Sequence, residues 1–197
     1  VKRVSLGAAL LKRLERVSGP VCETPGGNVA LNRLAKRLEA GRLAVLPDMT
    51  RPSLHLPGRL IVLDRSVLED HEEPDVAAGY ILTEDVARAA RDPLRELLDT
   101  VGLRETFRLL TTGDIAPEAL NAYAETLLTR ETVKPQIEGQ LARFAKAELR
   151  STPYAYARDI TGETTLPMIE GDPMNGKLTA PLLSDADWLR LQNICGG

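Results

Sequence analysis

Residues 77–94 read AAGYILTEDVARAARDPL, and this stretch decides the fold prediction because its apolar residues recur at helical spacing. A helix is expected to begin at Asp75, directly after Pro74, and the pair Asp92-Pro93 should start the next helix. One face of the first helix would carry Val76, Tyr80, Thr83, Ala87 and Ala90. The stretch therefore predicts a long helix that is followed closely by a second one.

Helical periodicity also dominates the rest of the chain. Further helices are expected over 4–17, 28–40, 64–70, 93–102, 103–110, 117–129 and 135–148, with Asn28 capping the second of them. Short strands are expected at 43–46 and 59–63, joined by an extended segment that contains prolines. Residues 151–183 are rich in loops, and Ser184 with Asp187 predicts a capping box at a final helix. The predicted class is α+β, mostly α, with a small sheet.

Length and composition indicate one globular domain over residues 1–197. This domain would comprise an N-terminal helix and loop (1–27), a core (28–150) and a loop-rich C-terminal segment (151–197). The formal net charge is −3, and no basic stripe with interleaved aromatic residues is present, which argues against nucleic acid as a partner. No run of apolar residues is long enough for a membrane span. The chain begins at Val1 and not at Met, so we expect a processed or truncated form from which a signal peptide or anchor could have been removed.

The two cysteines, Cys22 and Cys195, lie near opposite ends of the chain. Their separation fits neither a zinc knuckle nor a redox CxxC motif. In an oxidising compartment they could form a disulfide, which would contribute about 4–5 kcal/mol in the chain-entropy model. The alternative is two unrelated buried thiols.

Beyond the helical pattern, the span from Val29 to Leu94 resembles the gluzincin metallopeptidases related to the CAAX prenyl endopeptidase and the heat-shock membrane protease. The shared features, in matching order and spacing, are Leu56-Pro57-Gly58, an apolar strand, Leu68, Ala78, Glu84, Ala90, Arg91, Pro93 and Leu94. Residues 141–155 resemble the helix ending that follows the third metal ligand of that family. The resemblance implies a helical metallopeptidase-like scaffold with a small sheet.

The zinc ligands of that family are missing from this sequence. In the HExxH motif, histidines at i and i+4 bind one zinc ion and the glutamate polarises the zinc-bound water. The aligned positions hold Thr83, Glu84 and Ala87, so only the glutamate is present. Glu131 or Glu138 could match the third ligand, but Pro135 and Ala142 stand where the following Asp would be. The resemblance therefore implies a degenerate site with no catalytic residue, no metal ligand and no cofactor.

Other constellations give weaker signals. His71 lies in the acidic stretch EDHEEPD, which could bind a divalent ion but more often forms a solvated surface. His55 replaces an apolar residue of the family, and no nucleophile motif accompanies it. Glu84 without a metal is expected to be a surface or hydrogen-bonded carboxylate rather than a strong base. None of these residues predicts an active enzyme.

Three functions remain open after this comparison. The first is a pseudopeptidase that binds a peptide or protein partner through the former substrate cleft, at an edge formed by Leu54, His55, Leu56, Pro57 and Gly58. The second is a structural cell-envelope protein without a ligand. The third is a hydrolase with a rearranged metal site around Glu84, which would use His55 or His71. The family and the cysteines favour a bacterial, periplasmic or otherwise extracytoplasmic protein, with the cytoplasm as the alternative.

Overall fold

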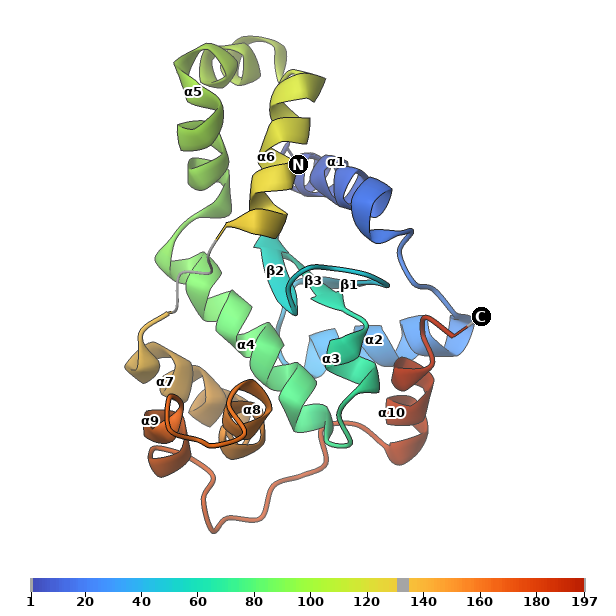
Figure 1. The fold of residues 1–197 in the computed structure, drawn as a ribbon, viewed down its shortest axis with the longest axis vertical. Helices are drawn as coiled ribbons and strands as arrows, with labels where there is room; N and C mark the ends of the chain where they lie inside the picture. The colour runs from blue at the N-terminus through green and yellow to red at the C-terminus, as the bar shows by residue number, and fades with distance from the viewer. Residues whose placement is uncertain (1, 131–134, 197) are drawn as a thin grey trace.

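The computed structural model describes residues 2–130 and 135–196, which form a mostly helical fold with a small three-stranded sheet (Figure 1). This confirms the predicted α+β class. The strands are β1 (Arg42–Leu46), β2 (Ser53–Leu56) and β3 (Leu60–Asp64). The helices are α1 (Lys2–Ser18), α2 (Pro25–Arg37), α3 (Ser66–Glu69), α4 (Pro74–Ala90), α5 (Pro93–Thr112), α6 (Pro117–Thr129), α7 (Ile137–Ala147), α8 (Thr152–Arg158), α9 (Leu166–Glu170) and α10 (Asp185–Gln192).

The sheet has the order β1-β3-β2, so β2 lies at one edge. β1 runs parallel to β3, whereas β2 runs antiparallel to it, with Ser53 opposite Leu63 and Leu56 opposite Leu60. β1 and β3 confirm the two predicted strands. The Pro-containing segment between them, expected only to be extended, forms the third strand.

Helices cover both faces of the sheet, and the alternation of side chains along each strand assigns them. Leu54, Leu56 and Val62 pack into a core with residues of α1, α5 and α6. Ile61 and Leu63 point to the opposite face, where α2, α3, α4, α7, α8, α9 and α10 contribute to a second core. Every residue of β3 is buried because the strand is central and both its faces are covered.

Helix α4 is buried on more than the one face that its sequence predicts. Its first two-thirds, from Asp75 to Glu84, contain nine buried residues. The helix lies between β2 on one side and α7 and α8 on the other, which explains this burial. Gly79 permits the approach of α8, since a Cβ atom there would lie 2.3 Å from Cγ of Tyr154. Only glycine fits at this helix crossing.

The C-terminal helix α10 is attached to the N-terminal part of the chain. Cys22 and Cys195 form the disulfide that the sequence left open. Trp188 of α10 donates a hydrogen bond from Nε1 to the carbonyl of Glu72, at 2.9 Å. Ser184 caps α10 as predicted, because its hydroxyl accepts a hydrogen bond from the Asp187 N–H.

The secondary structure departs from the predictions at α2 and in residues 151–183, and it confirms the predicted break at Gly102. α2 begins at Pro25 and is capped by Thr24, so the predicted cap at Asn28 is wrong. The sequence PGGN forms the first helical turn there because Pro at the first position and the Thr24 cap outweigh the low helix propensity of two glycines. Gly102 breaks α5 with a positive φ of 84°, as the predicted helix end required. The loop-rich segment 151–183 contains the short helices α8 and α9.

In the described ranges 2–130 and 135–196, no helix has both the length and the apolarity to cross a membrane.

Candidate functional site

The three residues that the sequence aligned with the HExxH motif, Thr83, Glu84 and Ala87, lie in the second half of α4. Thr83 and Glu84 are buried, and Ala87 is partly exposed one turn later. Glu84 retains only 4% of its accessible surface. A carboxylate enclosed to this degree must be hydrogen-bonded or paired, because an isolated buried charge is strongly unfavourable. Its partners therefore define the site.

Glu84 is held by two side chains from the edge strand β2. The Ser53 hydroxyl donates to Oε1 at 2.7 Å, and His55 Nδ1 lies 2.6 Å from Oε2. Ser53 and His55 are two residues apart in a strand, so both side chains point to the face that α4 covers. Leu54 and Leu56 point to the other face and are buried in the opposite core. The strand thus presents a polar pair to α4 and an apolar pair to the second core.

The hydrogen bonds around Glu84 outweigh its burial. Burial alone would raise the pKa of Glu84, but the hydrogen bonds from His55 and Ser53 and the positive charges of His55 and Arg51 hold the pKa below its ordinary value of 4.5. Burial in turn lowers the pKa of the Arg51 guanidinium. The Nε2 atom of His55 is enclosed and has no hydrogen-bond partner among the described residues. The cluster therefore keeps a negative Glu84 in a closed, positively charged environment.

Gln140 of α7 fills the space beside Thr83. The Thr83 hydroxyl donates to Gln140 Oε1 at 3.3 Å, and Gln140 Nε2 donates to the carbonyl of Pro135 at 2.9 Å. Burial raises the pKa of Tyr154 in α8, and the nearby Thr83 hydroxyl opposes that rise. Gln140 is 3% exposed. Thr83 is thus part of a packed polar contact between α4, α7 and α8.

These residues do not fit a zinc ion. Ala87 has no donor atom, the Thr83 hydroxyl is engaged, and the side chain of Glu84 is already bound by two neighbours. Glu138 lies exposed in the first turn of α7, while Glu131 falls outside the described residues. Over residues 2–130 and 135–196, no three His, Cys, Asp or Glu side chains gather closely enough to hold a metal ion.

The acidic stretch around His71 serves the packing of neighbouring elements. The His71 carbonyl accepts a hydrogen bond from Gln192 of α10 at 3.0 Å. Glu73 and Asp75 both pair with Arg150, at 2.6 and 2.8 Å. Burial raises the pKa of Asp75, and the Arg150 contacts only partly offset that rise. This stretch links α4 and α10 to the segment before α8.

The outer edge of β2 carries main-chain groups directed away from β3. The Asp64 N–H donates to the Pro52 carbonyl at 2.8 Å, which makes this a hydrogen-bonded pair of the antiparallel ladder. Because hydrogen-bonded pairs alternate, Leu54 and Leu56 bond to β3, whereas the N–H and C=O groups of Ser53 and His55 point outward. The outward Ser53 carbonyl accepts a hydrogen bond from Arg51 Nε at 2.9 Å.

A positively charged cleft lies at the Gly58 end of β2. Its volume is about 290 Å³, and its lining includes three arginines but a single acid: Arg3, Arg59, Arg88 and Asp92. Arg3 and Asp92 form a bidentate ion pair, in which Nη1 and Nη2 of Arg3 donate to Oδ1 and Oδ2 of Asp92 at 2.6 and 2.8 Å. Within the described part of the chain, the Arg59 side chain donates only to a main-chain carbonyl, that of Glu39, at 2.9 Å. The lining therefore has an excess of positive charge.

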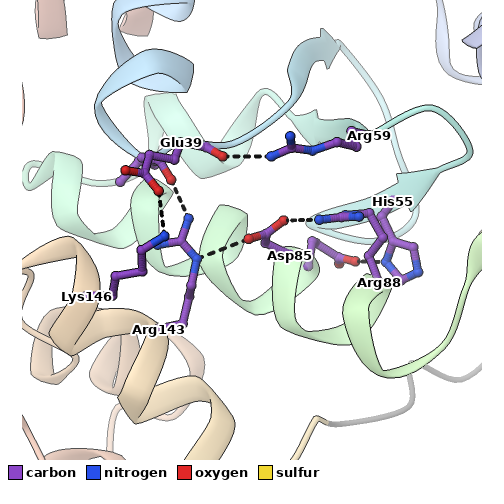
Figure 2. A network of polar contacts seen from close by, with 9 residues as sticks. Glu39, His55, Arg59, Asp85, Arg88, Arg143 and Lys146 are labelled. Atoms are coloured by element: carbon purple, nitrogen blue, oxygen red, sulfur yellow. Dashed lines mark hydrogen bonds and ion pairs between the residues drawn. The ribbon is translucent and has the colours of Figure 1, made fainter.

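Figure 2 shows how this end of β2 joins a wider polar network. Arg88 donates to Asp85 at 2.6 Å, and Asp85 also accepts from Arg143 of α7 at 3.1 Å. Burial would raise the pKa of Asp85, but these two guanidinium groups hold it below its ordinary value. Arg59 and Arg88 both lie on the side of the network where His55 is drawn (Figure 2). The arginines are thus positioned next to the edge strand.

The sequence suggested Glu84 together with His55 or His71 only as part of a rearranged metal site, and it gave no indication of Ser53 and Arg51. The alternation of Ser53, Leu54, His55 and Leu56 is a signal for a strand with one polar face. It does not name the helix that covers that face, because the separation between His55 and Glu84 is 29 residues. The pairing is a tertiary contact.

No protein-family model matches the chain, and no curated protein matches it closely enough to count as a relative. The resemblance to gluzincins therefore stays a prediction from the sequence.

Proposed function

We propose that this protein is a non-catalytic relative of the gluzincin peptidases that binds an extended peptide segment of a partner along the edge of β2. The observation that carries the proposal is the outward direction of the Ser53 and His55 main-chain groups at a sheet edge. An extended peptide adds to such an edge through main-chain hydrogen bonds, and these bonds require no metal and no catalytic side chain.

The edge is held rigid from both faces. On one face the side chains of Ser53 and His55 are fixed to Glu84, and on the other Leu54 and Leu56 are buried at 2% and 0% exposure. A strand that is fixed before binding loses little conformational entropy when a peptide docks, which favours affinity. In this proposal Glu84 is a structural residue that orients β2. Its enclosure also argues against a role as a base, which would have to contact a substrate or a water molecule.

Arg51 sets the register of the incoming strand. Its Nε atom already donates a hydrogen bond to the outward Ser53 carbonyl. An incoming peptide would therefore exchange this bond or pair first with the N–H and C=O of His55. Binding would then extend from His55 toward Gly58 and the cleft beyond it.

The cleft specifies the charge of the partner. Arg59 donates to no side chain among residues 2–130 and 135–196, so it is the arginine best able to bind a new carboxylate. The partner segment should thus carry an acidic side chain, or its terminal carboxylate, at the end that lies near Gly58. Charge complementarity at this end would fix the direction of the peptide.

The decisive test compares two substitutions at one position. Ser53→Pro and Ser53→Ala both remove the hydroxyl that binds Glu84, but only proline also removes the outward N–H. The probes are fluorescent peptides of alternating valine and threonine with a terminal glutamate, measured by fluorescence anisotropy. We expect Ser53→Pro to weaken binding by about tenfold relative to Ser53→Ala, because an interface hydrogen bond is lost. Equal affinities for the two variants would contradict strand addition.

The charge of the partner is tested with Arg59→Gln. This variant should reduce affinity for the glutamate-bearing peptide by about fivefold and leave the uncharged peptide unaffected. Arg42→Gln, at an exposed arginine of β1, is the matched control and should change neither affinity. Loss of binding to both peptides would show that Arg59 acts on folding instead. Cleavage of the wild-type peptide during the assay, sensitive to Glu84→Gln, would contradict a non-catalytic role.

A further inference from the structure

The longest connection between two elements in the described ranges is the loop of residues 171–184, which joins α9 to α10. It contains no helix or strand, and Figure 1 shows it extending from the end of the molecule opposite α5. Connections of this length without secondary structure are uncommon in compact domains, and many of them are functional. The 171–184 loop is therefore a candidate for a functional segment.

The middle of this loop is open to solvent. Residues 175–178 are all exposed, and Leu178 is fully so. A Cβ atom built at Gly176 would meet nothing within 4 Å, so no other part of the chain covers the loop at this point. Exposed loops of small and polar residues are the preferred sites of proteolytic cleavage in folded proteins.

Few hydrogen bonds hold the main chain here. Within the part of the chain that the structure describes, residues 178–183 form no hydrogen bond. Just before them, the Asn175 N–H donates to the carbonyl of Asp172 at 3.2 Å. The Lys177 N–H donates to that of Met174 at 3.0 Å. Both bonds are local, so the loop can become extended, as a protease requires of its substrate, without opening a helix or the sheet.

Lys177 is the only basic residue of the loop. Its ammonium group donates to the carbonyl of Pro173 at 2.8 Å and pairs with no carboxylate among residues 2–130 and 135–196. The prolines of the loop, Pro173 and Pro181, lie outside the stretch 174–180, so every residue close to Lys177 can pair through its main chain. Every other basic residue in the described ranges lies in a helix, a strand or a shorter connection. Lys177 is thus the basic residue that a protease can reach most easily.

The chain is firmly attached on both sides of the exposed stretch. Upstream, the Asp172 carboxylate accepts hydrogen bonds from the N–H and the hydroxyl of Thr152, at 3.0 and 2.5 Å. Downstream, Leu182 is buried in the core that α10 shares with α2. The disulfide between Cys22 and Cys195 joins the end of the chain to the segment before α2. A break between these anchors would leave both pieces in place.

We propose that the 171–184 loop is a processing site for a protease that cleaves after lysine. Water adds across the peptide bond between Lys177 and Leu178, which leaves a carboxylate on Lys177 and an ammonium group on Leu178. The product is a two-chain protein, residues 1–177 and 178–197, joined by the disulfide. Release of α10 would then require reduction in addition to cleavage. The inference does not depend on peptide binding at β2.

Limited proteolysis tests this inference. The full chain is treated with a low proportion of trypsin without reductant, and samples are followed by mass spectrometry and by denaturing gels run with and without reductant. We expect the first product to have the mass of the intact chain plus one water, cut after Lys177. It should separate into two pieces only after reduction. The circular dichroism of this product should match that of the uncut protein.

Two lysine variants identify the site. Lys177→Gln should slow the first cut by at least about tenfold, because the remaining sites are cleaved only when a more ordered segment opens. The matched control is Lys12→Gln, since the side chain of Lys12 is 78% exposed but lies in α1. This variant should be cut as fast as the wild type.

Four results would overturn the inference. The first is an initial cut at another residue, and the second is an equal rate for Lys177→Gln and wild type. The third is loss of the folded circular dichroism signal on cleavage, which would make the loop a structural link. The fourth is faster cleavage after Leu178 by chymotrypsin at equal protease concentration, which would assign the loop to a protease that prefers apolar residues.

Discussion

Removal of His55 should destabilise the protein far more than its position on an edge strand suggests. The side chains of His55 and Glu84 are 12% and 5% exposed and lie 2.6 Å apart. Breaking a buried pair by removing one partner costs about 3–5 kcal/mol, because the other charge remains buried and uncompensated. We therefore expect His55→Leu to lower the free energy of unfolding by about 3–5 kcal/mol at neutral pH.

The double variant separates this pairing from simple loss of volume. Glu84→Leu leaves Ser53 and His55 without their hydrogen-bond partner and should cost about 1–3 kcal/mol. His55→Leu/Glu84→Leu buries no charge, so its cost should lie near that of Glu84→Leu alone. The interaction energy from the cycle should then equal the cost of His55→Leu alone, about 3–5 kcal/mol. Urea unfolding followed by circular dichroism measures all four proteins, with His71→Leu as a control expected to stay within about 0.5 kcal/mol.

The contribution of Glu84 should also depend on pH. Its pKa is lowered in the folded protein, so the stabilisation is fully present above the unfolded value of 4.5 and is lost as the pH falls through the folded value. The stability difference between wild type and Glu84→Leu should therefore shrink on acidification below that range. An increase in stability on replacing Glu84 would refute the reasoning. A carboxylate that is kept for catalysis often destabilises the folded protein, so its replacement raises the free energy of unfolding. A more stable Glu84→Gln variant would show that Glu84 is such a residue.

Two further predictions concern packing around the second core. The variant Cys22→Ser/Cys195→Ser should lose up to about 5 kcal/mol in the chain-entropy model, because the disulfide closes a loop over a separation of 173 residues. The fluorescence of Trp188, the only tryptophan, should shift to longer wavelength at lower urea concentrations in this variant as α10 detaches. Gly79→Ala should cost about 1–3 kcal/mol in chemical denaturation, because the new methyl group would overlap the ring of Tyr154.

Each of these two predictions has a control within the chain. Wild-type protein treated with a reductant should reproduce the fluorescence shift, and an unchanged spectrum in both samples would show that α10 is held without the disulfide. Gly139→Ala lies in α7, where the nearest atom to a new Cβ is a Val86 methyl group at 3.3 Å. There alanine should be neutral or stabilising by up to about 1 kcal/mol through helix propensity. Equal effects of alanine at Gly79 and Gly139 would contradict the close approach of α4 and α8.

The sequence predicted most of the fold because its signals are local. Helical periodicity located α4, α6 and α7, and the serine cap located α10. The same kind of signal failed at Asn28, since the pattern could not decide between two polar residues, Thr24 and Asn28, as the cap before a Pro/Gly-rich turn. Short helices such as α8 and α9 have too few turns to show a period.

The candidate site was less predictable because it is made of contacts across the fold. The alignment with HExxH placed Thr83, Glu84 and Ala87 on one helix, which the structure has. The residues that neutralise Glu84 come from a strand, and the partner of Thr83 is Gln140, 57 positions later. Periodicity indicates which side chains are buried, but it does not indicate which residues they contact. A buried carboxylate does require partners, so the need for them could be foreseen but not their identity.

Amide hydrogen exchange along β2 tests the proposed function most directly. The Ser53 and His55 N–H groups point outward, whereas those of Leu54 and Leu56 already bond to β3. On addition of the glutamate-bearing peptide, exchange should slow at Ser53 and His55 and stay unchanged at the two leucines. Bound peptide with no change at Ser53 and His55, or equal slowing at all four residues, would contradict docking at this edge.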